Sequence, residues 1–223
     1  MPRAPTAARG IFLRNALAPP IISDYLPPML NPGFHQIPRG MVATVVTHLE
    51  MVTPPVATTV AHNFTFTRHT AADHDWYRTL FRAVGEDWLW FSRLHLADNV
   101  LTAILHDPDY EVWTLQDQGR DIGLLEIDHR TQGACELAFF GLTPESVGKG
   151  AGRVMMAQAI ARAFTRDINR FHVHTCTLDS PQALPFYTRA GFIPVKQEIE
   201  IAPDPRLTGH LPATAGAHVP VFK

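Results

Sequence analysis

The sequence predicts an α/β fold in which one mixed, mostly antiparallel sheet is flanked by helices. Two observations support this expectation. Residues 111–142 contain β-branched and aromatic segments separated by tight turns, which is typical of an antiparallel meander. After residue 142, a glycine-rich turn, a long helical pattern and another apolar strand follow in succession, and a crossover of that length joins parallel strands.

The first half of the patterned region is predicted to contain two strands and then two helices. β-branched residues occupy 42–49 and 64–67 on either side of a proline-containing loop, and we expect these consecutive strands to pair antiparallel. Apolar residues then follow a helical period over 71–84 and 87–105, with a glycine between the two helices.

The second half is predicted to contain three meander strands and then alternating helices and strands. In order, these are strands at 111–116, 122–128 and 136–142, a helix at 150–168, a strand at 171–177, a short helix at 181–189 and a strand at 192–201. The helical crossover makes 136–142 and 171–177 parallel. The proline-rich tail is expected to be loop, with a candidate edge strand at 218–222.

The chain divides into an extension, residues 1–40, and one domain, residues 41–223. The extension holds eight of the 19 prolines and shows no helical or strand period, so we expect an extended arm or a disordered segment. It lacks the apolar stretch of a secretion signal. Translation that starts at Met29 or Met41 is the alternative explanation for this segment.

Composition excludes several classes of protein. The 19 Lys+Arg and 21 Asp+Glu residues give a net charge of −2, so we expect neither a nucleic-acid partner nor a membrane-surface partner. No apolar run reaches the roughly 18 residues that span a bilayer. The two cysteines, Cys135 and Cys176, are expected to be free thiols, which favours a reducing, cytoplasmic setting.

A glycine-rich loop between a strand and a helix is the most informative segment. Gly148, Gly150 and Gly152 let backbone N–H groups approach a ligand, and a helix N-terminus attracts phosphate. Lys149 and Arg153 add positive charge. A nucleoside-triphosphate loop requires Ser or Thr directly after its lysine, and neither follows Lys149. A dinucleotide-binding loop needs a glycine at the position that Arg153 occupies.

Residues 147–152 resemble the pyrophosphate loop of the GNAT N-acetyltransferases, Gln/Arg-x-x-Gly-x-Gly/Ala, with Val147 in place of the usual Gln or Arg. Residues 179–192, which end in Tyr187-Thr-Arg-Ala-Gly-Phe, are similar to the second signature of that family. The resemblance is dense over 136–192, diffuse over 41–135 and absent over 1–40. It implies the GNAT acyl-CoA N-acyltransferase fold, with a splayed parallel strand pair, and acetyl-CoA as co-substrate without a metal.

The resemblance also implies which residues contact the coenzyme. They are Leu142, Thr143, Val147, Gly148, Lys149, Gly150, Ala151, Gly152, Arg153, Asp179 and Phe186. Leu142 and Thr143 would pair with pantetheine like an added strand, and a backbone N–H within 140–142 would meet the oxyanion. Arg162, Arg166 and Arg170 lie on a solvated face or reach the 3′-phosphate.

Acetyl transfer to an amine needs a base for the amine and an acid for the departing thiolate. The resemblance places Tyr187 as the acid. Glu136 begins the strand before the loop and is the candidate base, with a pKa raised by desolvation. The alternatives are that Glu136 is a strand-edge acid facing water, that Glu126 is the base, or that ordered water takes the proton.

We therefore expect an acetyl-CoA-dependent N-acetyltransferase that acts by direct transfer in a ternary complex. The acceptor would be the primary amine of a small molecule or peptide, and a homodimer is common in the family. A non-catalytic CoA-binding or sensing module, or a transferase that uses another acyl-CoA or a hydroxyl acceptor, is the alternative. His172 and His174 share a strand face but lack a third ligand, so no metal site is expected.

Overall fold

The computed structural model describes residues 30–56 and 61–223. The predicted N-terminal extension falls largely on residues 1–29, outside the described residues. The elements, in chain order, are β1 (Met41–Met51), β2 (Thr65–His69), α1 (His74–Gly85), η1 (Glu86–Trp88), α2 (Asp98–Leu105), β3 (Tyr110–Asp117), β4 (Arg120–Asp128), β5 (Ala134–Leu142), η2 (Pro144–Ser146), α3 (Ala151–Ala163), β6 (Arg170–Cys176), α4 (Ala183–Arg189) and β7 (Ile193–Pro203).

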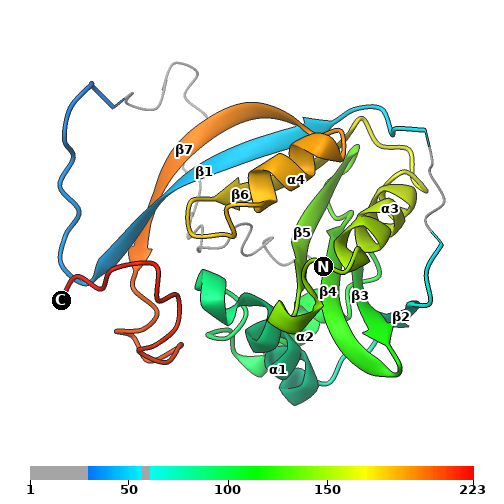
Figure 1. Cartoon of the computed structure of the whole chain (residues 1–223), viewed down its shortest axis with the longest axis horizontal. Coiled ribbons are helices and arrows are strands. Elements are labelled where there is room, and N and C mark those ends of the chain that lie inside the picture. The colour runs from blue at the N-terminus through cyan, green and yellow to red at the C-terminus, as the bar shows by residue number, and fades with distance from the viewer. Residues whose placement is uncertain (1–29, 57–60) are drawn as a thin grey trace, which may run out of the picture.

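Seven strands form one mixed sheet in the order β2-β3-β4-β5-β6-β1-β7 (Figure 1). β5 and β6 are parallel, as predicted, and the other neighbouring strands are antiparallel. The predicted meander is confirmed, and its first turn places Gln118 and Gly119 in the left-handed region with φ of 50° and 78°. Those φ values fit the two-residue turn that best matches strand twist.

The predicted pairing of the first two strands is wrong. β1 lies between β6 and β7, where Val46 is opposite Cys176 on one side and Glu198 on the other. β2 pairs with β3 at the far end of the sheet. The alternating pattern of a strand identifies the strand and its faces but not its partner, which the whole fold selects.

The predicted helix over 87–105 is also wrong, because only α2 is an α-helix within that range. Leu89 adopts a left-handed φ of 57° at the end of η1, which stops the helix. The chain then enters the core, where Leu89, Trp90 and Phe91 are buried. Residues 218–222 form no strand, so the candidate edge strand is wrong too.

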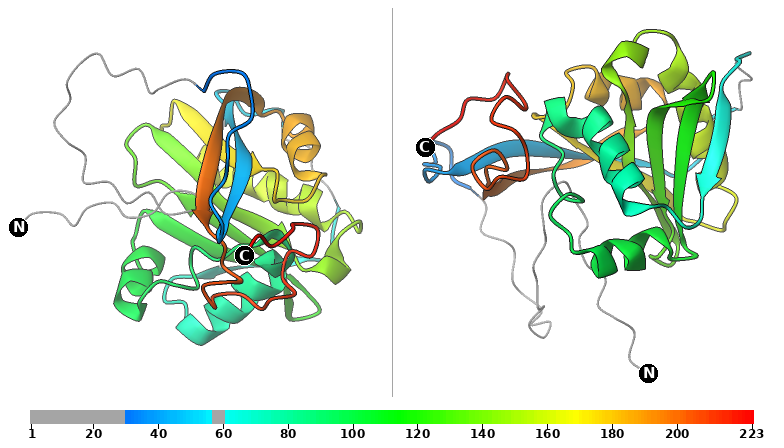
Figure 2. Two further views of the ribbon diagram at one scale, coloured as in Figure 1. Left: turned by 90° about the vertical axis from the view of Figure 1, so that its left-hand side faces the viewer. Right: turned by 90° about the horizontal axis from the view of Figure 1, so that it is seen from below.

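Helices cover both faces of the sheet, and adjacent residues of β4 show the two layers. Leu125 packs in the core that contains α3, whereas Leu124 packs in the core that contains α1 and α2. Figure 2 shows the β1–β7 ribbon projecting from this body, with the C-terminal segment beside it. No helix in the described part of the chain is long and apolar enough to cross a membrane.

Two irregularities open the sheet at its centre. β5 and β6 pair only from Ala134 opposite Arg170 to Glu136 opposite His172, and the strands are no longer paired beyond that point. In β5, Leu137 and Phe139 pair with adjacent residues of β4, which leaves Ala138 as a bulge. The loop before α3 and the start of α4 both lie beyond this opening (Figure 1).

Candidate active site

The glycine-rich loop follows β5 and leads into α3. Gly148 and Gly150 both have φ of 84°, and a Cβ at either position would meet no atom within 4 Å. The glycines are therefore needed for the backbone conformation, and the loop is open. No backbone carbonyl of the described residues accepts a hydrogen bond from the amides of 148–152. Five consecutive N–H groups at a helix N-terminus suit an anion.

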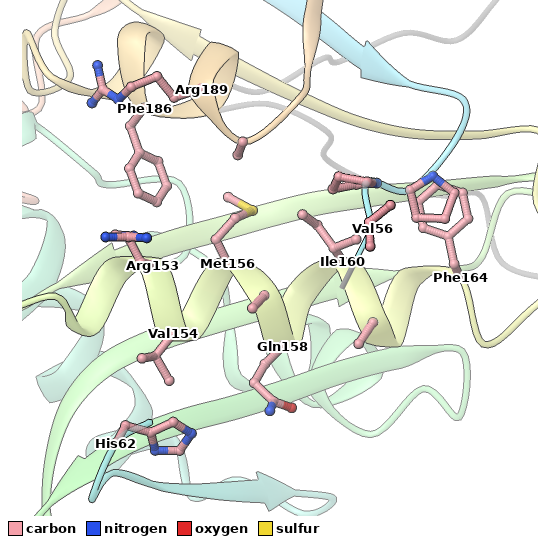
Figure 3. A pocket seen from close by; sticks show the side chains of 15 residues that line it. Val56, His62, Arg153, Val154, Met156, Gln158, Ile160, Phe164, Phe186 and Arg189 are labelled. Carbon is pink, nitrogen blue, oxygen red and sulfur yellow. The ribbon is translucent and has the colours of Figure 1, made fainter. Parts of the chain in front are cut away.

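A groove with a volume of about 860 Å³ runs along α3, between this helix, α4 and residues 54–56 (Figure 3). At the end near the glycine loop, Figure 3 shows Arg153 of α3 close to Phe186 and Arg189 of α4. Both arginines are exposed, and the residues that line the groove include no carboxylate. The groove therefore continues the positive character of the loop.

The three other arginines named above make contacts within the protein. Arg162 lies 3.8 Å from the centre of the Trp113 ring, Arg166 pairs with Asp109, and Arg170 pairs with Glu50. None of them lines the groove. These contacts favour a structural role over contact with a phosphate.

Tyr187 projects from α4 into the core beside β5. It is buried, and its ring lies 6.2 Å from that of Phe140 and 5.8 Å from that of Phe186. Burial raises the pKa of Tyr187 well above 10.0, and the charge of Asp179 raises it further. The phenol therefore keeps its proton throughout the neutral range, as an acid must.

Asp179 holds the turn between β6 and α4. Its carboxylate accepts hydrogen bonds from the Thr175 hydroxyl at 2.7 Å, the Cys176 amide at 2.9 Å and the Trp90 indole at 3.3 Å. The resemblance assigned Asp179 to coenzyme binding, but its carboxylate already accepts three hydrogen bonds from the protein itself.

Glu136 lies on the other face of the sheet, at the point where β5 and β6 separate. It is only 7% exposed, so its interpretation as a water-facing strand-edge acid is wrong. Its Oε1 lies 3.5 Å from Nδ1 of His174. Burial raises the pKa of Glu136, but the hydrogen bond and charge of His174, together with the charge of His172, outweigh burial and lower it. The predicted upward shift is therefore wrong.

The sequence did not indicate His174 as the partner of Glu136. Burial lowers the pKa of His174, but the hydrogen bond and charge of Glu136, with the charges of Asp179 and Glu200, raise it above 6.5. The contact could have been predicted from the expected parallel pairing. In that register His172 is opposite Glu136, and His174 comes two residues later on the same face.

Glu126, the reserve base, belongs to the core. Its side chain is fully buried and accepts a hydrogen bond from Tyr77 at 2.6 Å and another from Tyr110. Arg93 lies 3.6 Å from the same carboxylate. All of these contacts are with buried residues of the core, which favours a structural role for Glu126 over proton transfer.

Both cysteines lie in the core. Cys135 and Cys176 are both free and buried, as predicted, and burial raises the pKa of each thiol. Within the described residues, no group of three His, Cys, Asp or Glu side chains has the arrangement of a metal site.

The model of the Acetyltransferase (GNAT) family matches residues 72–192, more than half of the chain, so the chain belongs to this family. The match includes the bulged strand, the glycine loop and Tyr187. Membership implies acyl-CoA-dependent acyl transfer in general. No curated protein sequence matches the chain.

Similar solved structures support the fold. A GCN5-related N-acetyltransferase from Kribbella flavida has 16% identity and a TM-score of 0.51, covering 76% of this chain and 63% of that protein. A GCN5-related N-acetyltransferase from Sphaerobacter thermophilus has 16% identity and a TM-score of 0.52, and the match covers 74% of this chain and 52% of that protein. A functionally unknown conserved protein from Staphylococcus epidermidis has 14% identity and a TM-score of 0.52, covering 74% and 63%. The chain thus spans less than two thirds of these proteins.

Proposed function

We propose that this chain is an acetyl-CoA-dependent N-acetyltransferase that transfers an acetyl group directly to a primary amine in a ternary complex. The observation that carries the proposal is the open loop, whose five amides bond to no backbone carbonyl among the described residues. The loop lies next to a positively charged groove and a buried, protonated tyrosine. The acceptor would be a small molecule or a peptide.

The coenzyme would be held mainly by the backbone. The amides of residues 148–152 would bind its diphosphate, and Lys149 and Arg153 would add positive charge. This arrangement tolerates Val147, whose side chain is 64% exposed and blocks none of these amides. Leu142 and Thr143 would pair with pantetheine, and Phe186 would line the entrance to the groove.

The acceptor amine must lose a proton before or as it attacks the thioester carbonyl. With its lowered pKa, Glu136 is ionised at neutral pH, and its contact with His174 at 3.5 Å holds the carboxylate in place. We assign proton acceptance to Glu136 and a positioning role to His174. Attack forms the N–C bond, and the carbonyl oxygen becomes an oxyanion that a backbone N–H of residues 140–142 would stabilise.

Collapse of the tetrahedral intermediate breaks the C–S bond. The electron pair goes to sulfur, and Tyr187 donates its phenolic proton to the thiolate as that bond breaks. Because the pKa of Tyr187 lies well above 10.0, its phenolate takes up a proton again at neutral pH, which returns the enzyme to its starting state. The buried thiols agree with a reducing compartment, and we place the enzyme in the cytoplasm.

The decisive experiment measures release of free thiol from acetyl-CoA with a panel of amines. We expect release that depends on the amine and falls in Tyr187→Phe. Coenzyme A binding by calorimetry with no transfer to any amine class would support the sensing alternative instead. Competition among acetyl-, propionyl- and succinyl-CoA would identify a different acyl preference.

A further inference from the structure

Trp90 lies across the opening between β5 and β6, on the face of the sheet opposite Tyr187. Its ring packs in the core that contains α1, whereas Tyr187 packs in the core that contains α3. On the β5 side, a Cβ at Gly141 would lie only 3.1 Å from Cη2 of the Trp90 ring. On the β6 side, the indole N–H donates to Oδ1 of Asp179 at 3.3 Å. One side chain therefore joins β5 to the turn that follows β6.

The packing around the Trp90 ring restricts its movement. A Cβ at Gly85, the last residue of α1, would lie 2.4 Å from Cδ2 of the ring, so the end of the helix packs directly against it. The ring centres of Phe81 and Phe139 lie 5.5 Å and 5.2 Å away. Trp90 is only 7% exposed, and its N–H is the only polar group of the side chain. The hydrogen bond to Asp179 thus completes the restraint that close packing begins.

The other end of this link is anchored in β6. The Asp179 carboxylate also accepts hydrogen bonds from the Thr175 hydroxyl at 2.7 Å and the Cys176 amide at 2.9 Å, and both donors belong to β6. At the narrow end of the opening, β5 and β6 are held together by their parallel pairing. At the wide end, Trp90 and Asp179 join them. Two strands that are joined at both ends keep a fixed separation between those ends.

We propose that Trp90 and Asp179 are positioning residues that fix the width of this opening and so restrict the acyl donor to short chains. This inference rests on the proposed function, which places the thioester in the opening, with Tyr187 on one face. Trp90 covers the wide end on the other face. An acyl chain longer than acetyl would have to spread the strands against a packed ring and its hydrogen bond. In a tight apolar site, one extra methylene changes affinity by about 10-fold or more.

Calorimetry of the full chain with acetyl-, propionyl- and butyryl-CoA, without an amine, tests the proposal and requires no turnover. The wild type should bind acetyl-CoA about 100-fold more tightly than butyryl-CoA, at about 10-fold for each added methylene. Trp90→Phe keeps an aromatic ring but removes the N–H. Asp179→Asn replaces the charged acceptor with a weaker, neutral one. Each variant should reduce the acetyl-to-butyryl ratio by about 10-fold, mainly through tighter binding of butyryl-CoA.

Trp113→Phe is the matched control. The Trp113 indole also donates to a carboxylate, Oε2 of Glu111 at 2.7 Å, but both residues belong to β3, which β4 separates from the opening. This variant loses the same kind of hydrogen bond and should keep the wild-type ratio. Circular dichroism checks the fold of each variant, and Asp179→Asn decides the test if Trp90→Phe does not fold.

The ratio between donors also cancels an indirect effect of Asp179. Its charge raises the pKa of Tyr187, so Asp179→Asn changes turnover with every donor alike, and the ratio of kcat/KM values should follow the ratio of affinities. Equal affinity of the wild type for the three donors, or an unchanged ratio in either folded variant, would overturn this inference and leave the proposed function intact. A wild type that binds no acyl-CoA would contradict the proposed function as well.

Discussion

The side chains of Glu136 and His174 meet just past the end of the parallel pairing between β5 and β6, with Oε1 and Nδ1 3.5 Å apart. The pair lies where the two strands separate, and both side chains are nearly buried, with side-chain exposures of 8% and 11%. A carboxylate and an imidazole in this position are strongly coupled, so their titration affects stability as well as chemistry.

The stability of this pair should depend on pH in a defined window. The folded-state pKa of Glu136 is below 4.5, so its contribution is complete above 4.5 and is lost as pH falls through the folded value. The folded-state pKa of His174 is above 6.5, so its contribution is complete below 6.5 and is lost as pH rises through that value. The His174→Ala substitution should therefore lower the free energy of unfolding most between these two pH values, by about 3 kcal/mol as measured by urea unfolding. A cost that does not vary with pH would contradict the pairing.

Tyr187→Phe should lower kcat by about 100-fold with little change in KM for acetyl-CoA, because only the proton donor to the thiolate is lost. The buried ring packs against Phe140 and Phe192, and Phe preserves these contacts. Steady-state kinetics and thermal unfolding together test this expectation. A variant with normal turnover would exclude Tyr187 from the reaction.

Gly148→Ala and Gly150→Ala should each destabilise the protein by about 1 kcal/mol, because a side chain disfavours the left-handed conformation. Both should also weaken CoA binding in calorimetry, since the strained loop no longer presents its amides well. Gly209→Ala is a matched control: Gly209 has φ of 81° and equally open surroundings, but it lies in the C-terminal segment. It should show a similar stability loss with unchanged CoA affinity.

Tyr77→Phe tests whether Glu126 is structural. The substitution removes the 2.6 Å hydrogen bond to the fully buried carboxylate and should cost about 1–3 kcal/mol in the free energy of unfolding. At temperatures where the variant is folded, kcat should equal that of the wild type. A large loss of kcat in the folded variant would instead return Glu126 to the list of candidate bases.

Local patterns predicted the central part of the fold. The meander strands, the crossover helix and the parallel relation of β5 and β6 follow from alternation, helical period and chirality, which act over short stretches. The glycine-rich turn between β5 and α3 follows from the same local reasoning, and the structure adds that Gly148 and Gly150 are left-handed.

The predictions that were wrong concern contacts between residues far apart in the sequence. The position of β1 between β6 and β7 is set by partner residues at least 120 positions later, and nothing within 41–51 specifies them. The apolar run after Trp88 looked helical, but packing places Leu89 in a left-handed conformation instead. The pKa of Glu136 was misjudged because burial was foreseen and its partner His174 was not.

The central claim is that the loop amides hold the diphosphate of an acyl-CoA whose acyl group passes to an amine. It is tested most directly by comparing kcat/KM for acetyl-CoA and for acetylpantetheine, which lacks the diphosphate together with the 3′-phosphoadenosine, with the same amine, in the wild type and in Gly148→Ala. Loss of two hydrogen bonds to a charged group, at about 1.5 kcal/mol each, predicts a decrease of roughly 100-fold. Equal values for the two donors, or no amine-dependent thiol release from either, would contradict the claim.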